Sequence, residues 1–256
     1  MDLRLTFNED AANYDRWRPG YSDELFADIF EYAKLQRGDQ ALEIGIGTGQ
    51  ATEPFLRAGL DVTAVELGAD LAGYVQGKFA EYPNLRVHNG SFEDYVCEEG
   101  SIGVLYSATA FHWIPDDVGY PKAHRLLKTG GTLALFWNRP SCVSEHDPVH
   151  IGIQQMYRKY RPGSNPPTPQ EETARREHIA SMISQCGFRD VQVKLYHRER
   201  RFGAEEYICL LNTYSDHRAT AADVKSAFER EVADVIRTHG NVMRLHDTMD
   251  LYLARK

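Results

Sequence analysis

Three glycines at alternate positions, Gly45, Gly47 and Gly49, follow Glu43 in the segment Ala41-Leu-Glu-Ile-Gly-Ile-Gly-Thr-Gly-Gln50. Glycine adopts backbone conformations that other residues avoid, and it lets a ligand approach the main chain closely. Such a turn between a strand and a helix can bind a nucleotide-like ligand. In the dinucleotide fingerprint G-x-G-x-x-G the last glycine follows the second by three residues, not two. The spacing therefore favours a nucleotide-like ligand other than a nicotinamide dinucleotide.

A second acidic residue, Glu66, ends the apolar segment Asp61-Val-Thr-Ala-Val-Glu66. A carboxylate at the end of a strand can accept hydrogen bonds from both hydroxyls of a ribose. Glu66 could instead be a solvated strand end. Together with the glycine turn, it indicates a site for a nucleoside.

A histidine between two aromatic residues, Phe111-His112-Trp113, follows the apolar segment 101–106. In a doubly wound fold, the end of this strand borders the place where a bound cofactor meets its substrate. His112 could therefore orient or deprotonate an acceptor, although a histidine among aromatic residues is equally often a packing residue. Trp113 is better explained as a wall of the site.

Strand and helix patterns alternate along the first half of the chain. Strands are expected at 40–45, 61–66, 85–88, 101–106 and 132–137, and helices at 22–33, 51–58, 70–82 and 116–127. This alternation predicts an α/β fold with a doubly wound parallel sheet and right-handed crossovers. Further strands at 188–202 and 248–254, with helices at 204–214 and 221–239, complete a mostly parallel sheet of seven strands.

Six prolines interrupt the pattern between Asn138 and a helix expected from Gln170. This composition is typical of an inserted cap. We therefore divide the chain into a cofactor-binding core with an N-terminal lid (1–140), a helical cap (141–187) and a segment that completes the sheet (188–256). Residues 1–21 and 141–170 carry aromatic side chains suited to cover an apolar part of a bound ligand: Phe7, Tyr14, Trp17, Tyr157 and Tyr160.

The glycine segment 41–50 resembles motif I of the class I S-adenosylmethionine-dependent methyltransferases, and Glu66 matches their ribose acid. Three further segments resemble that family in order: Phe7 to Tyr21, Ser107-Ala-Thr-Ala-Phe-His-Trp113 and Leu126-Leu-Lys-Thr-Gly-Gly-Thr132. The resemblance covers about residues 5–140. It implies the Rossmann-like methyltransferase fold, S-adenosylmethionine as cofactor and S-adenosylhomocysteine as product.

The resemblance also implies a set of site residues. His112 is the candidate catalytic residue, and the cofactor-binding residues expected are Tyr14, Arg18, Glu43, Gly45, Gly47, Gly49, Glu66, Leu67, Ser91, Phe92 and Ser107. Three roles stay open. Arg18 pairs with a surface acid or with the cofactor carboxylate, and Glu43 holds the turn or reaches the cofactor ammonium. In Gly90-Ser-Phe-Glu-Asp94, where relatives place an acid, the adenine is held by Ser91 and Phe92 or by Glu93.

Within this family the sequence is most similar to the trans-aconitate methyltransferase group, whose members methylate small carboxylates. This favours a small-molecule acceptor with a carboxylate oxygen, which is ionised at neutral pH and needs no base. The alternatives are a nicotinamide-dependent oxidoreductase and a non-catalytic S-adenosylmethionine-binding protein.

The composition supports small-molecule chemistry. The chain has 256 residues, a formal net charge of −8 and 42% hydrophobic residues. A net acidic chain lacks the basic footprint of a nucleic-acid-binding protein, and no apolar run is long enough to cross a membrane. The four cysteines form no C-x-x-C pair, so no metal site is expected and the thiols are predicted to be reduced. A cytoplasmic protein is expected, as a monomer or a dimer.

Overall fold

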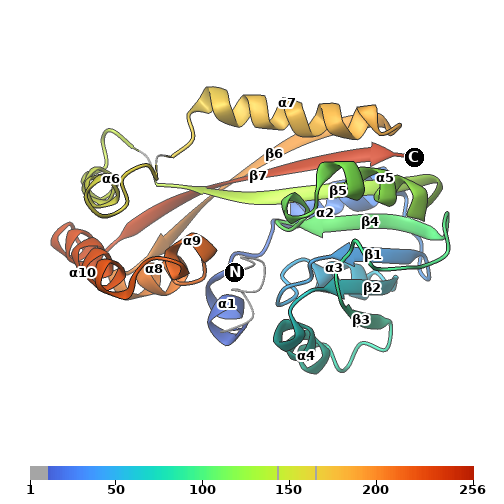
Figure 1. The fold of residues 1–256 in the computed structure, drawn as a ribbon, viewed down its shortest axis with the longest axis horizontal. Coiled ribbons are helices and arrows are strands. Elements are labelled where there is room, and N and C mark those ends of the chain that lie inside the picture. Colours follow the sequence, from blue (N-terminus) through green and yellow to red (C-terminus); the bar gives the residue numbers. More distant parts are fainter. Residues whose placement is uncertain (1–10, 143, 165) are drawn as a thin grey trace.

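The computed structural model describes residues 11–142, 144–164 and 166–256. They form a seven-stranded sheet with the strand order β3-β2-β1-β4-β5-β7-β6 (Figure 1). The strands are β1 (Gln40–Ile44), β2 (Asp61–Glu66), β3 (Leu85–Asn89), β4 (Ile102–Ala108), β5 (Leu127–Ser141), β6 (Arg189–Phe202) and β7 (Met243–Arg255). The α/β fold with a mostly parallel sheet of seven strands is confirmed.

The first five strands are parallel, and β7 runs antiparallel to both β5 and β6. Parallel strands end at the same edge of a sheet, and ligands of doubly wound folds bind at that edge where the strand order reverses. Here the order reverses between β1 and β4. The fold therefore brings the glycine turn after β1, Glu66 at the end of β2 and the loop after β4 to one edge.

Helices cover both faces of the sheet. The helices are α1 (Ala11–Trp17), α2 (Asp23–Ala33), α3 (Thr52–Arg57), α4 (Ala69–Lys78), α5 (Asp116–Leu126), α6 (Pro148–Tyr160), α7 (Pro169–Gln185), α8 (Ala204–Leu211), α9 (Ser215–Arg218) and α10 (Ala222–Thr238), with a short 3-10 turn, η2 (Phe111–Trp113). The apolar sides of α2, α3 and α4 share one core with the sheet, and those of α5 and α7 share another. This two-sided packing buries most of β1, β2, β4 and the parallel part of β5, whereas the edge strand β3 stays partly exposed.

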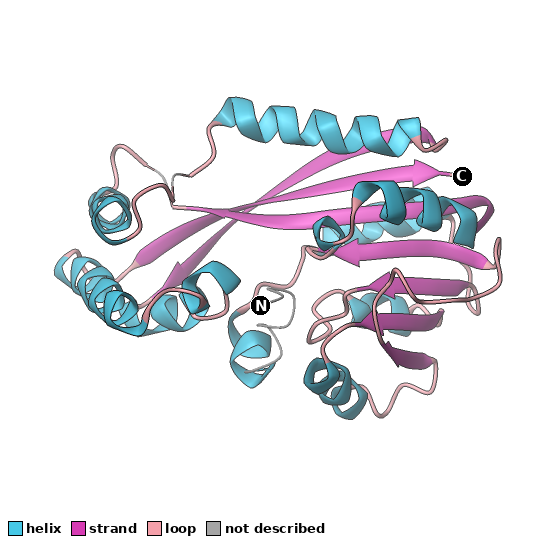
Figure 2. Ribbon diagram, in the orientation of Figure 1, coloured by secondary structure: helices cyan, strands magenta, loops and turns pink. Residues whose placement is uncertain are grey.

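The three long strands β5, β6 and β7 extend beyond the parallel part of the sheet (Figure 2). At their far end, α6, α8 and α10 bury a third apolar core around Phe228 and Ile153. In Figure 1, α1 lies between this helical cluster and α4, and α1 contacts α4. The molecule therefore has two packed ends, and α1 bridges them on the side where the parallel strands terminate.

Two local expectations from the sequence differ from the structure. The proline-rich stretch contains a helix, α6, because Pro148 occupies its first turn, where a missing N–H costs nothing, and Asp147 caps it by accepting from the Val149 N–H at 2.9 Å. The strand expected at 132–137 is longer in the structure, because β5 begins at Leu127 and includes Gly130 and Gly131. The expected cap thus contains two helices, α6 against α10 and α7 alongside β6.

Within the described part of the chain, no helix combines the length and the apolar character needed to cross a bilayer.

Candidate active site

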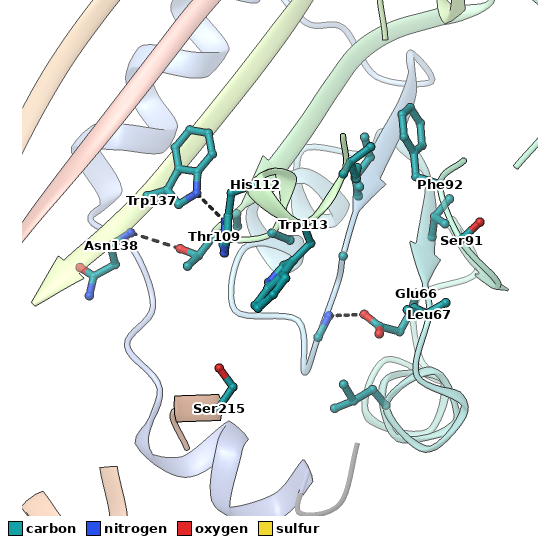
Figure 3. Close-up of a pocket in the computed structure, with 18 of the residues that line it drawn as sticks. Glu66, Leu67, Ser91, Phe92, Thr109, His112, Trp113, Trp137, Asn138 and Ser215 are labelled. Atoms are coloured by element: carbon teal, nitrogen blue, oxygen red, sulfur yellow. Dashed lines mark hydrogen bonds between the residues drawn. The ribbon is translucent and has the colours of Figure 1, made fainter. Parts of the chain in front are cut away.

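A cavity of about 690 Å³ opens at the carboxyl edge of the parallel strands. The residues that line it include Tyr14, Arg18, Gly45, Gly47, Glu66, Leu67, Ser91, Phe92, Glu93, Thr109, His112, Trp113, Asp116, Trp137, Asn138, Arg139, Arg175, His178, Tyr214 and Ser215. In the view of Figure 3, Glu66, Leu67, Ser91 and Phe92 stand on one side, and Thr109, His112, Trp137 and Asn138 stand on the other. The cavity therefore has two ends, one beside β2 and β3 and one beside the ends of β4 and β5.

The side chain of Glu66 accepts hydrogen bonds from the backbone of the glycine turn and from Gly68. Its Oε2 accepts a hydrogen bond from the Gly47 N–H and its Oε1 accepts one from the Gly68 N–H, each at 2.9 Å. Burial raises the pKa of the Glu66 carboxyl, and these backbone bonds oppose that effect. A carboxylate oxygen can accept more than one hydrogen bond, so Glu66 keeps acceptor capacity toward the cavity. This arrangement fits a ribose diol.

The three glycines of the turn have different surroundings. A Cβ atom on Gly45 would lie 2.4 Å from the Cβ of Ala110, and one on Gly49 would lie 2.3 Å from Cε2 of Phe79. A Cβ on Gly47 would meet nothing closer than 3.8 Å, although its φ of +57° disfavours other residues. Gly45 and Gly47 line the cavity, and Gly49 lies against the Phe79 ring outside it.

The structure places Glu43 and Ser107 beneath the cavity, outside its lining. The hydroxyls of Thr52 and Tyr106 donate to Oε2 of Glu43 at 2.8 and 2.9 Å. Burial raises the pKa of Glu43 to about 8. The Ser107 hydroxyl donates to the Ile44 carbonyl at 2.8 Å. In this structure both side chains connect β1 to β4, and Glu43 also fixes the start of α3.

The loop after β3 forms one end of the cavity. Ser91, Phe92 and Glu93 all line it, together with Leu67. The Ser91 hydroxyl donates to Asp94 Oδ2 at 2.7 Å and accepts from the Asp94 N–H at 3.0 Å, so its hydroxyl is occupied within the loop. Both of the alternatives that the sequence leaves for the adenine, Ser91 with Phe92 or Glu93, are therefore present at this end.

Arg18 projects into the cavity from the segment after α1. Its guanidinium lies 4.1 Å from the centre of the Tyr214 ring and 5.0 Å from that of Tyr14, and Nη2 donates to the Thr213 carbonyl at 2.8 Å. Nε is enclosed and has no acceptor among the described residues. No carboxylate in residues 11–142, 144–164 or 166–256 forms an ion pair with Arg18. A cavity-lining guanidinium without a paired carboxylate is suited to an anionic group of a ligand.

His112 lies on η2 and is accessible from the cavity. The indole N–H of Trp137 donates to His112 Nδ1 at 3.0 Å (Figure 3). Desolvation by the surrounding protein and the charge of Arg139 lower the pKa of His112 to about 4. The imidazole is therefore neutral at neutral pH.

Sequence reasoning missed the residues at the end of β5 and on α7. Arg139 Nε donates to both carboxylate oxygens of the buried Asp250, at 2.9 and 3.1 Å. Its Nη atoms form no hydrogen bond with a described residue. Arg175 lines the cavity from α7 and donates to Glu172 Oε1 at 3.0 Å. The segment Trp137-Asn-Arg139 stands at the end of an expected strand, and this position could have identified Arg139 as a site residue. No feature of the local sequence identifies Arg175 as one.

In the part of the chain that the structure describes, no three His, Cys, Asp or Glu side chains come together as a metal-binding group.

Comparisons with known proteins agree with this geometry. Residues 41–131 match the family model of a methyltransferase domain. An uncharacterized methyltransferase of Schizosaccharomyces pombe is 25% identical over 235 residues, which cover 91% of this chain and 88% of the relative. An uncharacterized methyltransferase of Mycobacterium tuberculosis is 29% identical over 137 residues, and this alignment covers only 54% of each chain.

Solved structures share the fold. A putative type II methyltransferase from Anaeromyxobacter dehalogenans aligns with a TM-score of 0.65 and 21% identity over 93% of this chain and 97% of that one. Phosphoethanolamine N-methyltransferase 2 of Haemonchus contortus, solved with S-adenosyl-L-methionine, aligns with a TM-score of 0.55 and 16% identity over 100% of this chain and 57% of that one.

The methyltransferase domain at 41–131, the shared fold and the cavity beside Glu66 together indicate a methyltransferase that uses S-adenosylmethionine. None of these findings supports the nicotinamide-dependent alternative.

Proposed function

We propose that this enzyme transfers a methyl group from S-adenosylmethionine to a carboxylate oxygen of a small molecule, as in the trans-aconitate methyltransferase group that its motifs resemble. The observation that carries the proposal is the composition of the cavity beside β4 and β5. Arg139, Arg175 and the neutral imidazole of His112 line that end. These groups suit an anionic acceptor.

The residues that line the other end fit the cofactor. Glu66 is proposed to bind the ribose, and the Leu67, Ser91 and Phe92 side chains to enclose the adenine. The open space at Gly47 allows the ligand to contact the backbone. Arg18, which lines the cavity and has no ion pair among the described residues, is proposed to bind the cofactor carboxylate, and Tyr14 to cover the methionine end. Glu43, Gly49 and Ser107 are proposed to support the turn from outside the cavity.

Bound S-adenosylmethionine supplies a methyl carbon attached to a positively charged sulfur, so that an oxygen lone pair forms the new C–O bond while the C–S electron pair stays on sulfur. A carboxylic acid has a pKa near ~4 and is ionised at neutral pH. No proton has to leave the acceptor. The protein's contribution is then alignment and the exclusion of water.

Arg139 is proposed to bind the acceptor carboxylate. Its Nε donates to Asp250, which is fully buried, and lies 3.9 Å from Glu172 Oε2 of α7. Arg139 lines the cavity, and its Nη atoms have no hydrogen-bond partner among the described residues. The guanidinium can donate two parallel hydrogen bonds to a carboxylate. The ion pair with Asp250 therefore serves to orient the arginine.

The size and charge of the protein suit a small acceptor. A volume of about 690 Å³ lies in the range of small-molecule sites, roughly 300–1,000 Å³. The net charge of −8 disfavours a nucleic acid as substrate. A cytoplasmic location is part of this proposal.

The test is transfer of an isotope-labelled methyl group to a panel of small mono-, di- and tricarboxylic acids, each paired with its primary amide. We expect label in a product that alkali hydrolyses, as it does an ester, and none with the amides. Label in an alkali-stable product would contradict carboxylate methylation. Cofactor binding without turnover of any acid would favour the non-catalytic alternative. The Arg139→Met variant, compared with Arg244→Met away from the cavity, should raise the KM for the acid at least tenfold.

A further inference from the structure

Trp137 determines which nitrogen of His112 carries the proton. An indole N–H can only donate a hydrogen bond, and it lies 3.0 Å from Nδ1 of His112. Nδ1 must therefore supply its lone pair. A neutral imidazole has one N–H, so the proton lies on Nε2.

Nε2 of His112 is free to contact a ligand. It has no hydrogen-bond partner among the described residues, whose only bond to this ring is the one that Trp137 donates to Nδ1. The His112 ring is accessible and lines the cavity. The two nitrogens of an imidazole direct their hydrogen bonds apart, so the Nε2–H donor points away from Trp137.

The charged groups around His112 oppose its protonation. Desolvation and, after it, the charge of Arg139 from β5 lower the pKa of His112 to about 4. Arg175 and His178 of α7 line the same cavity. Two acids offset these groups: Glu172 of α7 pairs with Arg175, and Asp116 at the start of α5 lies 3.7 Å from His178. Protonation would also place a second N–H against the indole N–H and break that hydrogen bond.

Trp137 is itself held firmly. Its side chain is buried, with an exposed fraction of 4%, and its ring packs edge to face against Tyr252 at 5.6 Å. Its backbone pairs with Asp250 in the register of β5 and β7. The indole N–H therefore has a fixed direction before any ligand binds.

We propose that Trp137 is a positioning residue that holds His112 in the Nε2–H form, and that this N–H donates a hydrogen bond to the anionic oxygen of the acceptor. The first half of this proposal concerns the tautomer of His112, and the second half, the hydrogen bond to the acceptor, rests on the proposed function. His112 then has no lone pair directed into the cavity and cannot act as a base. The acceptor has to arrive already ionised, which selects acids over alcohols, phenols and ammonium groups.

Long-range proton–nitrogen NMR of the full-length protein labelled at histidine nitrogens tests the first half. The two neutral tautomers give different nitrogen shifts, and the His112 signals are those lost in His112→Gln. We expect the Nε2–H pattern at pH 7, unchanged at pH 6. An Nδ1–H pattern, or a mixture of both tautomers, would overturn the proposal.

Trp137→Phe keeps an aromatic ring and removes the N–H. We expect the His112 signals to shift to a mixture of tautomers, whereas Trp113→Phe, at a neighbouring tryptophan of the same cavity, should keep the Nε2–H pattern. An unchanged Nε2–H pattern in folded Trp137→Phe would show that Trp137 does not fix the tautomer.

A pair of amide variants at His112 tests the second half and does not depend on the Trp137 variant folding. The glutamine amide can place an N–H where Nε2–H lies, whereas the shorter asparagine amide reaches only the position of Nδ1. We expect kcat/KM for the acid to be about 10- to 100-fold higher in His112→Gln than in His112→Asn, the range for a hydrogen bond to a charged group. Equal losses in both variants would indicate a base and overturn the proposal.

The NMR measurement separates this proposal from the proposed function, because it requires no acceptor. If no carboxylic acid is methylated, the proposed function and the second half fail together. A wild-type Nε2–H pattern that Trp137→Phe alters would still support the role of Trp137.

Discussion

The backbone N–H of Gly47 donates a 2.9 Å hydrogen bond to Oε2 of Glu66, so the turn after β1 and the acid at the end of β2 form one unit. The N–H of Gly68 completes the unit by donating to Oε1. The carboxylate therefore has two functions: it is proposed to bind the ribose, and it satisfies two backbone donors of the protein itself.

Substitution of Glu66 should consequently affect both binding and stability. In Glu66→Ala the N–H groups of Gly47 and Gly68 lose their acceptors, which we expect to lower the free energy of unfolding by about 1–3 kcal/mol. Binding of S-adenosylhomocysteine should weaken by about 1.5–3 kcal/mol. Calorimetric titration and denaturant unfolding measure the two effects. Glu66→Gln, which keeps one acceptor oxygen, should lose less of both, and a change in affinity below threefold in Glu66→Ala would contradict the ribose assignment.

Gly47 and Gly49 should respond differently to alanine. In Gly47→Ala the new methyl group meets no protein atom closely, so the expected cost is about 1–2 kcal/mol of backbone strain, together with weaker binding of S-adenosylhomocysteine because the methyl group faces the cavity. In Gly49→Ala the methyl group would overlap the Phe79 ring, so the loss of Tm should be larger. Thermal unfolding and titration of both variants would distinguish a ligand-facing glycine from a packing one. Undiminished affinity in folded Gly47→Ala would exclude close contact of the ligand at this residue.

Helix α1 is expected to order when the cofactor binds. None of its residues is buried, and Asp15 ties it to α4 by accepting from the Tyr74 hydroxyl at 3.0 Å and from Lys78 at 2.6 Å. Hydrogen exchange in 11–17 should slow when S-adenosylhomocysteine is added, because Tyr14 and Arg18 then contact ligand. The buried face of α10 serves as the unaffected control. Equal exchange with and without ligand would show that α1 is no lid. Phe7 and the rest of the expected lid at 1–10 lie outside the described residues.

Glu43 should make stability depend on pH. Its pKa is raised to about 8 in the folded protein, above the value of an unfolded glutamate. Between the two values the unfolded chain releases a proton that the folded chain keeps, so stability falls as pH rises through this window. Glu43→Gln removes the effect, and its stability relative to wild type should rise on the order of 3 kcal/mol from pH 5 to pH 8. A difference in the free energy of unfolding between Glu43→Gln and wild type that stays constant from pH 5 to pH 8 would contradict a buried, neutral Glu43.

Much of the fold follows from local patterns. The bounds of β2 and the start of α2 after Ser22 were predictable because strand periodicity and helix caps depend on neighbouring residues. The same holds for the glycine turn and Glu66, which lie at the ends of adjacent parallel strands. By contrast, α6 was not predicted, because the prolines near it were interpreted as interrupting regular structure, whereas they lie at the boundaries of the helix.

The acceptor end of the cavity depends on contacts between distant parts of the chain. Arg139 is oriented by Asp250 across β5 and β7, and Arg175 arrives on a helix whose position over the sheet is set by tertiary packing. His112 was identified from its place after β4, but its bond from Trp137 spans 25 residues and leaves no mark in the local sequence. These pairings become visible only when the strands are aligned in register.

The central claim is that the cavity beside Glu66 binds S-adenosylmethionine, and the most direct test is calorimetric titration of the wild-type protein with S-adenosylhomocysteine and, separately, with NADH. We predict one site with affinity in the micromolar range for S-adenosylhomocysteine and no heat of binding with NADH. Binding of NADH without binding of S-adenosylhomocysteine would contradict the account.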